Sequence, residues 1–144
     1  MPTEGASPGD IRAQLTREWL RKSRDDLSTC HRALESPRLD DVAAYHAQQA
    51  VEKALKGFLV WHDTPFRKTH NLVELLRQCQ SINQDIPDFS EPARLITTYA
   101  LQSRYPDLQA EPDPEAVDMF VDTAAKIHRE ILNRLPDEVD PARP

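Results

Sequence analysis

Hydrophobic positions recur at helical spacing along most of this chain, and prolines separate the segments that carry the spacing. The first segment, residues 9–36, opens with Asp10 as the expected cap and has one face formed by Trp19, Leu20, Ser23, Leu27, Cys30 and Leu34. The second is expected to run from Asp40 or Asp41 to about His62. Its apolar face is rich in alanine, which favours close helix–helix approach, and consists of Ala43, Ala47, Ala50, Val51, Ala54, Leu55, Phe58 and Trp61.

Three shorter helices are predicted in the second half of the chain, over residues 69–79, 90–105 and 114–135. Thr69 is the expected cap of the first of these, and Pro114 takes a first-turn position in the last. No run of alternating apolar residues predicts a strand. The sequence therefore predicts an all-α, up-and-down bundle of about five helices over residues 10–136, with flexible tails at 1–9 and 137–144.

The amino-acid composition excludes several classes of function. The 144 residues include only 3 glycines, which excludes Walker-type loops and dinucleotide-binding fingerprints. The formal net charge of −6 argues against a surface that binds nucleic acid throughout, although it is compatible with a local basic patch. Cys30 and Cys79 lack metal-ligand spacing, and no third ligand joins His62 and His70, so neither a metal site nor a cofactor is predicted.

The cysteine usage fits a reducing compartment, and the apolar runs are too short to span a membrane. The first ten residues also lack the apolar core of a signal peptide. We therefore expect a cytoplasmic protein.

The second helix carries another set of positions, spaced alternately by four and three residues, that packing alone does not explain: Val42, His46, Gln49, Lys53, Lys56 and Val60. One interpretation is a partly exposed face with solvated lysines. The other is a lined groove or helix–helix interface that requires hydrogen-bond donors and positive charge. Glu52 and Lys56 are also spaced to pair along the helix, which would take up one of these charges.

The sequence Ser-Arg-Tyr-Pro-Asp at 103–107 places Arg104 and Tyr105 directly before a helix-ending proline. An arginine fork suits phosphate or carboxylate, and a tyrosine offers a stacking face and a hydroxyl. The alternative is structural, with Tyr105 packing at the helix end and Arg104 capping carbonyls or pairing with an acid.

Four blocks of this sequence resemble the HEPN family, the higher eukaryotes and prokaryotes nucleotide-binding domain. In chain order they are residues 19–27 (WLRKSRDDL), 46–56 (HAQQAVEKALK), 69–72 (THNL) and 104–107 (RYPD). The blocks lie between residues 19 and 107, and the resemblance covers about residues 17–135. The chain is similar to the stand-alone prokaryotic branch, which is typically encoded beside a minimal nucleotidyltransferase (MNT) as a toxin–antitoxin-like pair.

This resemblance implies a helical bundle that forms a homodimer, binds nucleotide or RNA in a groove and has an MNT protein as its partner. The chain would be the toxin-like half of that pair. The residues expected to bind nucleotide or RNA are Arg104, Tyr105, His46, Gln49, Lys53 and Lys56. Tyr105 is also the positional candidate for adenylylation by the partner.

Many HEPN proteins are metal-independent ribonucleases with an arginine followed four to six residues later by a histidine. This chain departs from that motif, because the next histidine after Arg104 is His128. Arg104 and His46 are the catalytic candidates if the second helix faces the Arg104 corner. Enzymatic activity is thus an open question, and the alternatives to a binding partner of MNT are a ribonuclease toxin or a helical scaffold that binds no nucleotide.

Overall fold

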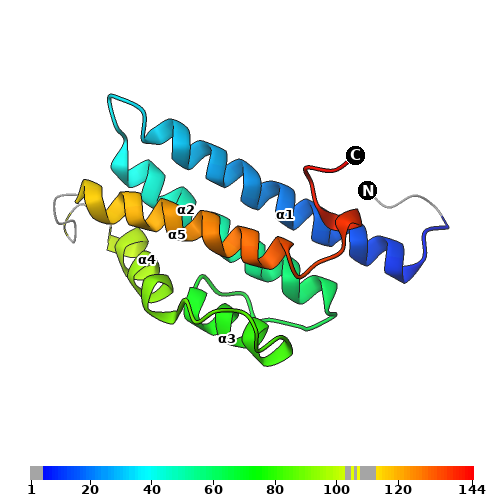
Figure 1. Ribbon diagram of the computed structural model, residues 1–144. Coiled ribbons are helices and arrows are strands. Elements are labelled where there is room, and N and C mark those ends of the chain that lie inside the picture. Colours follow the sequence, from blue (N-terminus) through cyan, green and yellow to red (C-terminus); the bar gives the residue numbers. More distant parts are fainter. Residues whose placement is uncertain (1–4, 103–104, 106, 108–112) are drawn as a thin grey trace.

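The computed structural model describes residues 5–102, 105, 107 and 113–144. Within these residues the chain forms five α-helices and one short 3-10 helix, and it contains no strand. The elements are α1 (Pro8–Ala33), α2 (Asp40–Trp61), α3 (Leu72–Ile82), α4 (Ser90–Gln102), α5 (Pro114–Leu132) and η1 (Asp137–Val139). Figure 1 shows the three long helices lying lengthwise together, with α3 and α4 along one side. The predicted all-α bundle is confirmed.

Helices α1 and α2 pack closely, as the alanine-rich face of α2 predicts. The alanines of that face are fully buried, at positions 43, 47, 50 and 54. Near the end of α2, a Cβ added to Gly57 would lie only 3.1 Å from the Cβ of Trp19. Small residues thus allow the two backbones to approach, while Phe58 and Leu55 fill the core around them.

Two helix starts differ from the prediction. Ser7, rather than Asp10, caps α1, and Asp10 completes a capping box from the third helical position. Asn71, rather than Thr69, caps α3, because the Asn71 side chain accepts hydrogen bonds from two backbone amides of the first turn. Thr69 instead accepts a hydrogen bond from the backbone of Asn71, 3.1 Å away. The starts of α1 and α3 thus each have two residues of capping type within three positions of one another, and the sequence pattern does not distinguish them.

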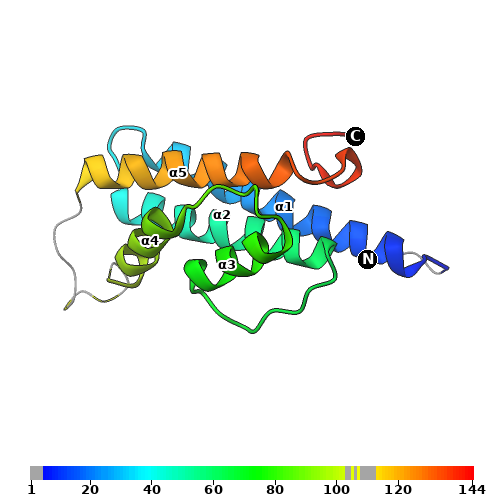
Figure 2. The ribbon, with the colours of Figure 1, turned by 60° about the horizontal axis from the view of Figure 1, so that its bottom comes forward.

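The segment between α2 and α3, residues 62–71, runs back along α2 before α3 begins (Figure 2). Its contacts trace this course, because Phe66 lies against Lys56 and His70 lies against Glu52, further toward the start of α2. The segment therefore forms one border of the exposed side of α2. The opposite border is α1.

The residues after Pro136 are folded against α1, which differs from the flexible tail that the sequence predicts. Val139 is fully buried within the hydrophobic core. The guanidinium of Arg17 donates hydrogen bonds to the backbone carbonyls of Glu138, at 3.2 Å, and Asp140, at 2.7 Å. A single apolar residue in a polar stretch has no periodicity, so the sequence pattern could not indicate this contact.

None of the helices in the described part of the chain has the length and apolar character needed to cross a membrane.

Candidate functional site

One side of α2 is polar along most of its length. At 100° per residue, the side chains that share this arc and turn away from the alanines are Tyr45, His46, Gln48, Gln49, Glu52, Lys53 and Lys56. We call this arc the polar face of α2. Helix α1 borders it on one edge and residues 62–71 border it on the other, and a buried carboxylate lies at each edge.

At the α1 edge, Asp26 binds two side chains of the polar face. Its Oδ1 lies 2.7 Å from His46 Nδ1, and its Oδ2 accepts a hydrogen bond of 2.6 Å from Lys53 Nζ. The Asp26 side chain is 10% exposed, whereas those of His46 and Lys53 are 27% and 22% exposed. The carboxylate therefore lies beneath its two partners and holds both at the surface. Because Nδ1 faces Asp26, the other ring nitrogen of His46 stays available to a ligand.

At the opposite edge, Glu52 accepts hydrogen bonds from three side chains. His70 Nδ1 lies 2.7 Å from Oε1, Gln48 Nε2 lies 3.1 Å from the same oxygen, and Lys56 Nζ lies 3.1 Å from Oε2. Burial alone would raise the pKa of Glu52, but the hydrogen bonds from His70, Gln48 and Lys56 outweigh it and hold that pKa below its ordinary value. Glu52 is thus an ionised carboxylate at neutral pH.

Lys56 is buried between two aromatic rings. Its Nζ lies 5.8 Å from the ring centroid of Trp19 on α1 and 5.6 Å from that of Phe66. Only 8% of the side chain is exposed. The predicted pair with Glu52 is therefore confirmed, and the interpretation of the lysines as a solvated face is wrong for Lys56.

A pocket of about 240 Å³ opens beside His70, where α4 meets α2 and the start of α3. Its lining includes Gln48, His70, Thr97 and Leu101. The His70 side chain is 68% exposed, so this imidazole is held by Glu52 and still reaches solvent. Because Thr97 and Leu101 belong to α4, the pocket extends the polar face of α2 toward the end of α4.

The residues predicted from the sequence occupy three positions relative to this face. His46 and Lys53 lie at the α1 edge, and Lys56 lies toward the Glu52 edge. Gln49 lies between the edges, and its Nε2 donates a hydrogen bond of 2.7 Å to the side-chain oxygen of Gln48. Tyr105 follows α4 and is 50% exposed. Arg104 lies outside the described residues.

Three participants were not selected from the sequence: Asp26, Gln48 and His70. Asp26 lies on the first helix beside another aspartate, where a carboxylate is ordinary, and no helical spacing links His70 to Glu52, 18 residues earlier. The contacts of Asp26 span 20 and 27 residues along the chain, so helical periodicity does not reveal them. Gln48 and Glu52 do have the spacing of a pair along one helix, as Glu52 and Lys56 do, and these two spacings are local signals of the network.

This site contains two carboxylate–histidine pairs, Asp26–His46 and Glu52–His70, which determine its chemistry. Each carboxylate orients an imidazole through a hydrogen bond at Nδ1. Such a pair is suited to proton transfer and to contact with an anion. No three His, Cys, Asp or Glu side chains group as metal ligands in the described part of the chain.

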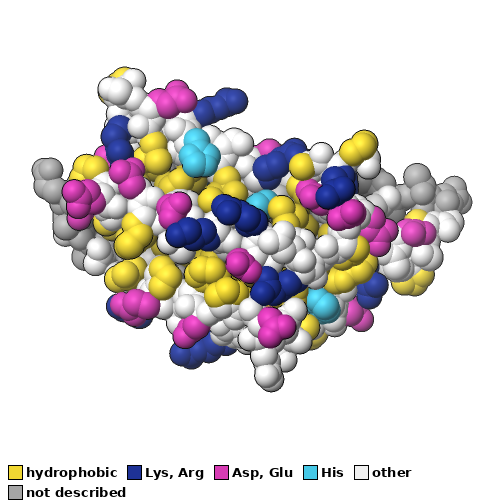
Figure 3. Space-filling model, viewed as in Figure 1, with side chains coloured by type: hydrophobic (Ala, Val, Ile, Leu, Met, Phe, Trp, Pro, Cys, Tyr) yellow, Lys and Arg dark blue, Asp and Glu magenta, His cyan; other side chains and the backbone are white. Residues whose placement is uncertain are grey.

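The face of the molecule shown in Figure 3 has basic and acidic side chains interspersed among apolar ones. It presents no continuous basic surface over α5 and its neighbours. On this face the basic side chains are therefore dispersed among acidic and apolar ones.

The fold and the site define an all-α bundle protein with histidines and lysines anchored by carboxylates along its second helix. The HEPN domain profile matches residues 16–135, so the chain belongs to the HEPN family. This membership links the protein to a nucleotide- or RNA-related function. Comparison with curated proteins and comparison with solved structures give no match.

Proposed function

We propose that this HEPN protein binds RNA or nucleotide phosphate along the polar face of α2. We further propose that it acts as a homodimer and is the toxin-like half of a pair with a minimal nucleotidyltransferase. Family membership supports the nucleotide or RNA ligand. The pairing and the dimer are supported by the resemblance of residues 46–56 and 104–107 to the stand-alone branch of the family.

The observation that carries the binding proposal is the array of His46, Lys53, Lys56 and His70 on one side of α2. Each of these side chains is held by Asp26 or Glu52, so little side-chain freedom is lost when phosphate binds. The ammonium groups of Lys53 and Lys56 and the ring nitrogens of the two histidines give the array several donors for phosphate oxygens. Phosphate contacts from such side chains position a nucleic acid without reading its sequence.

Fluorescence anisotropy with an internally labelled single-stranded RNA tests this proposal. We expect Lys53→Ala to weaken binding several-fold and to reduce the dependence of log affinity on log salt concentration by about 0.7, the value for one phosphate contact on a single strand. Lys126→Ala is the matched control, because Lys126 is 59% exposed on α5 and forms an ordinary surface pair with Asp122. Equal affinities for the two variants would contradict binding at this face. No RNA binding and no rise in melting temperature with nucleotide would instead support the scaffold alternative.

The proposed partnership predicts that an MNT gene lies beside the gene of this protein, and co-expression of the two genes tests it. We expect the two proteins to co-purify and the tyrosine at 105 to gain an adenylyl group when ATP is supplied, as measured by intact mass and peptide mapping. Tyr105 is half exposed, which is compatible with modification by a partner. A Tyr105→Phe variant that still gains the mass would assign the modification to another residue. Sedimentation of the protein alone tests the dimer.

A metal-independent ribonuclease is the second candidate, and the His70–Glu52 pair is the observation that favours it. In that reaction His70 takes the proton of a ribose 2′-hydroxyl, the 2′-oxygen bonds to the adjacent phosphorus, and the bond to the 5′-oxygen breaks. The leaving oxygen takes a proton from solvent, and His70 returns its proton to solvent. Incubation of RNA with the wild type, Arg104→Ala, His46→Gln and His70→Gln in the presence of EDTA tests this candidate. Absence of cleavage by the wild type would exclude it.

A further inference from the structure

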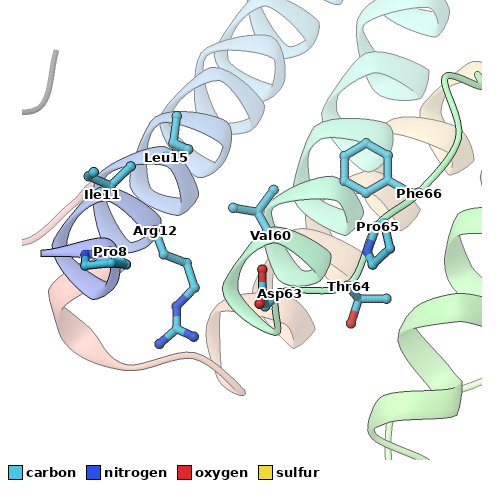
Figure 4. Close-up of a pocket in the computed structure, with 9 residues that line it drawn as sticks. All are labelled: Pro8, Ile11, Arg12, Leu15, Val60, Asp63, Thr64, Pro65 and Phe66. Atoms are coloured by element: carbon cyan, nitrogen blue, oxygen red, sulfur yellow. The ribbon is translucent and has the colours of Figure 1, made fainter.

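A second cavity lies between the start of α1 and the turn that ends α2 (Figure 4). Its volume is about 590 Å³, within the size range of small-ligand pockets, and it is open to solvent. Apolar side chains line much of it, including Ile11, Leu15, Val60 and Phe66. Two charged residues face each other across it, Arg12 from α1 and Asp63 from the turn after α2.

Arg12 has no acceptor for its guanidinium within the described part of the chain. Its guanidinium carbon lies 4.6 Å from the ring centroid of Trp61, and its Nε is buried without a hydrogen-bond partner. Stacking on an indole holds the planar fork in place and leaves the donors at its edge free. A fork of this kind matches the oxygens of a phosphate or carboxylate. The cavity thus contains a preoriented cation that lacks an anion.

Asp63 is fixed by the backbone geometry at the end of α2. Its φ of 51° is left-handed, its amide donates to the carbonyl of Val60 at 3.0 Å, and the amide of Thr64 donates to that of Leu59 at 2.9 Å. These are the two hydrogen bonds of a Schellman cap. The Asp63 carboxylate therefore remains on the wall opposite α1. A phosphate in the cavity is repelled from that wall and is favoured only at Arg12.

The cavity continues the polar face of α2. Val60 lies one helical turn beyond Lys56 on the same side of the helix, and Phe66 contacts both the cavity and Lys56. Lys53 and Val60 are seven residues apart, a distance of about 10 Å along a helix axis. A nucleic acid strand that follows Lys53 and Lys56 in this direction thus arrives at the cavity.

We propose that this cavity binds the terminal nucleotide of the RNA, with a terminal phosphate monoester on Arg12 and the base against Phe66 and Val60. This inference rests on the proposed RNA-binding function and specifies the kind of RNA end that the site takes. A terminal monoester carries about −1.5 to −2 charges at neutral pH, whereas an internal diester carries about −1. A single unpaired arginine beside apolar walls therefore distinguishes a strand end from the interior of a strand.

Three RNAs of one sequence, each labelled internally, test the inference by anisotropy: one with a 5′-phosphate, one with a 3′-phosphate and one with hydroxyls at both ends. We expect the wild type to bind one phosphorylated RNA about tenfold or more tightly than the hydroxyl RNA, and the preferred end reports the strand direction. Arg12→Gln is expected to reduce that ratio to about one. Asp63→Asn is expected to increase it, because a repelling charge is removed.

Two controls separate this inference from the function on which it rests. Lys53→Ala is expected to weaken binding of all three RNAs by a similar factor and so to preserve the ratio. Arg32→Gln, an exposed arginine near the other end of α1, is expected to behave as wild type. RNA binding by the wild type without preference for either phosphate would overturn the inference alone. Absence of any RNA binding would overturn both proposals. If Arg12→Gln fails to fold, Arg12→Lys takes its place, because lysine keeps the charge but lacks the planar fork. Arg12→Lys is expected to lower the ratio of affinities for phosphorylated and hydroxyl RNA severalfold. An unchanged ratio would contradict the site.

Discussion

His46 Nδ1 and Asp26 Oδ1 lie 2.7 Å apart across the interface between α1 and α2. The same carboxylate accepts a hydrogen bond from Lys53, so one buried acid determines where two side chains of the polar face lie. The stability of the helix pair and the charge of the proposed RNA-binding surface are therefore coupled through Asp26.

The substitution Asp26→Asn separates these two contributions. It keeps the shape of the side chain but leaves Lys53 and His46 without their carboxylate, so the free energy of unfolding is expected to fall by about 1–3 kcal/mol. RNA affinity is expected to rise, because the negative charge removed from the polar face has a larger effect than the side-chain freedom that His46 and Lys53 gain. Urea denaturation and anisotropy measure the two effects. Asp25→Asn is the control, since Asp25 is 58% exposed and pairs with Arg21 on the surface. Weaker RNA binding by Asp26→Asn would contradict this account.

Glu52 is expected to be the more important carboxylate for stability. Glu52→Gln leaves the Lys56 ammonium, with 8% of its side chain exposed, beside an uncharged partner. Removing one partner of a buried ion pair costs about 3–5 kcal/mol, whereas replacing both with apolar groups is often tolerated. The double variant Glu52→Gln, Lys56→Met should therefore recover part of the loss in urea denaturation.

Glu91→Gln provides the matched comparison for Glu52→Gln. Glu91 pairs with Arg94 three residues later on the exposed side of α4. Such surface pairs contribute little, so its unfolding midpoint is expected to equal that of the wild type. A similar midpoint for Glu52→Gln and Glu91→Gln would show that the Glu52 network is not structural.

Local patterns predicted most of the helices and part of the site. Helical spacing between prolines located the five α-helices of the described residues, and the four-and-three spacing of His46, Lys53 and Lys56 marked the polar face. The Glu52–Lys56 pair followed from spacing along one helix. These features depend on residues that are close in the sequence, so one sequence is enough to find them.

The partners that complete the site come from distant positions. Asp26 meets Lys53 across two helices, and His70 reaches Glu52 only because residues 62–71 run back along α2. The Arg12 cavity likewise needs the turn after α2 to lie beside the start of α1. The path of a connecting segment is set by tertiary packing, which the hydrophobic pattern of single elements does not contain.

The C-terminal segment is expected to contribute to stability through Val139. Val139 is fully buried, and Val139→Ala removes buried methyl groups from the core. We expect a loss of about 1–3 kcal/mol in urea denaturation, in the range for truncation of a buried aliphatic side chain. Glu138→Ala is the control, because Glu138 is exposed and contacts Arg17 through its backbone carbonyl. If both variants denature at the wild-type midpoint, the segment is not part of the stable fold.

His128 makes stability depend on pH. It is 7% exposed, and its Nδ1 lies 2.8 Å from the hydroxyl oxygen of Ser23, which itself donates to the carbonyl of Ala50 at 2.7 Å. Burial lowers the pKa of His128 to about 4, with the nearby Arg24 lowering it further and Asp140 opposing the change. Between about pH 4 and pH 6.5, the His128 imidazole is therefore neutral in the folded protein and protonated in the unfolded chain.

The sign of the effect follows from proton uptake by the two states. Between pH 6.5 and 4 the unfolded chain binds the proton and the folded protein does not, so acidification favours unfolding. The contribution of His128 is complete above pH 6.5, and about 2 kcal/mol of it is lost between pH 7 and pH 5. Urea denaturation at these two pH values should show this loss in the wild type and a smaller loss in His128→Gln. His31→Gln is the control, because it changes an exposed histidine on α1, and it should lose as much stability between pH 7 and pH 5 as the wild type does. If His128→Gln also loses as much stability as the wild type, the pH dependence belongs to other groups.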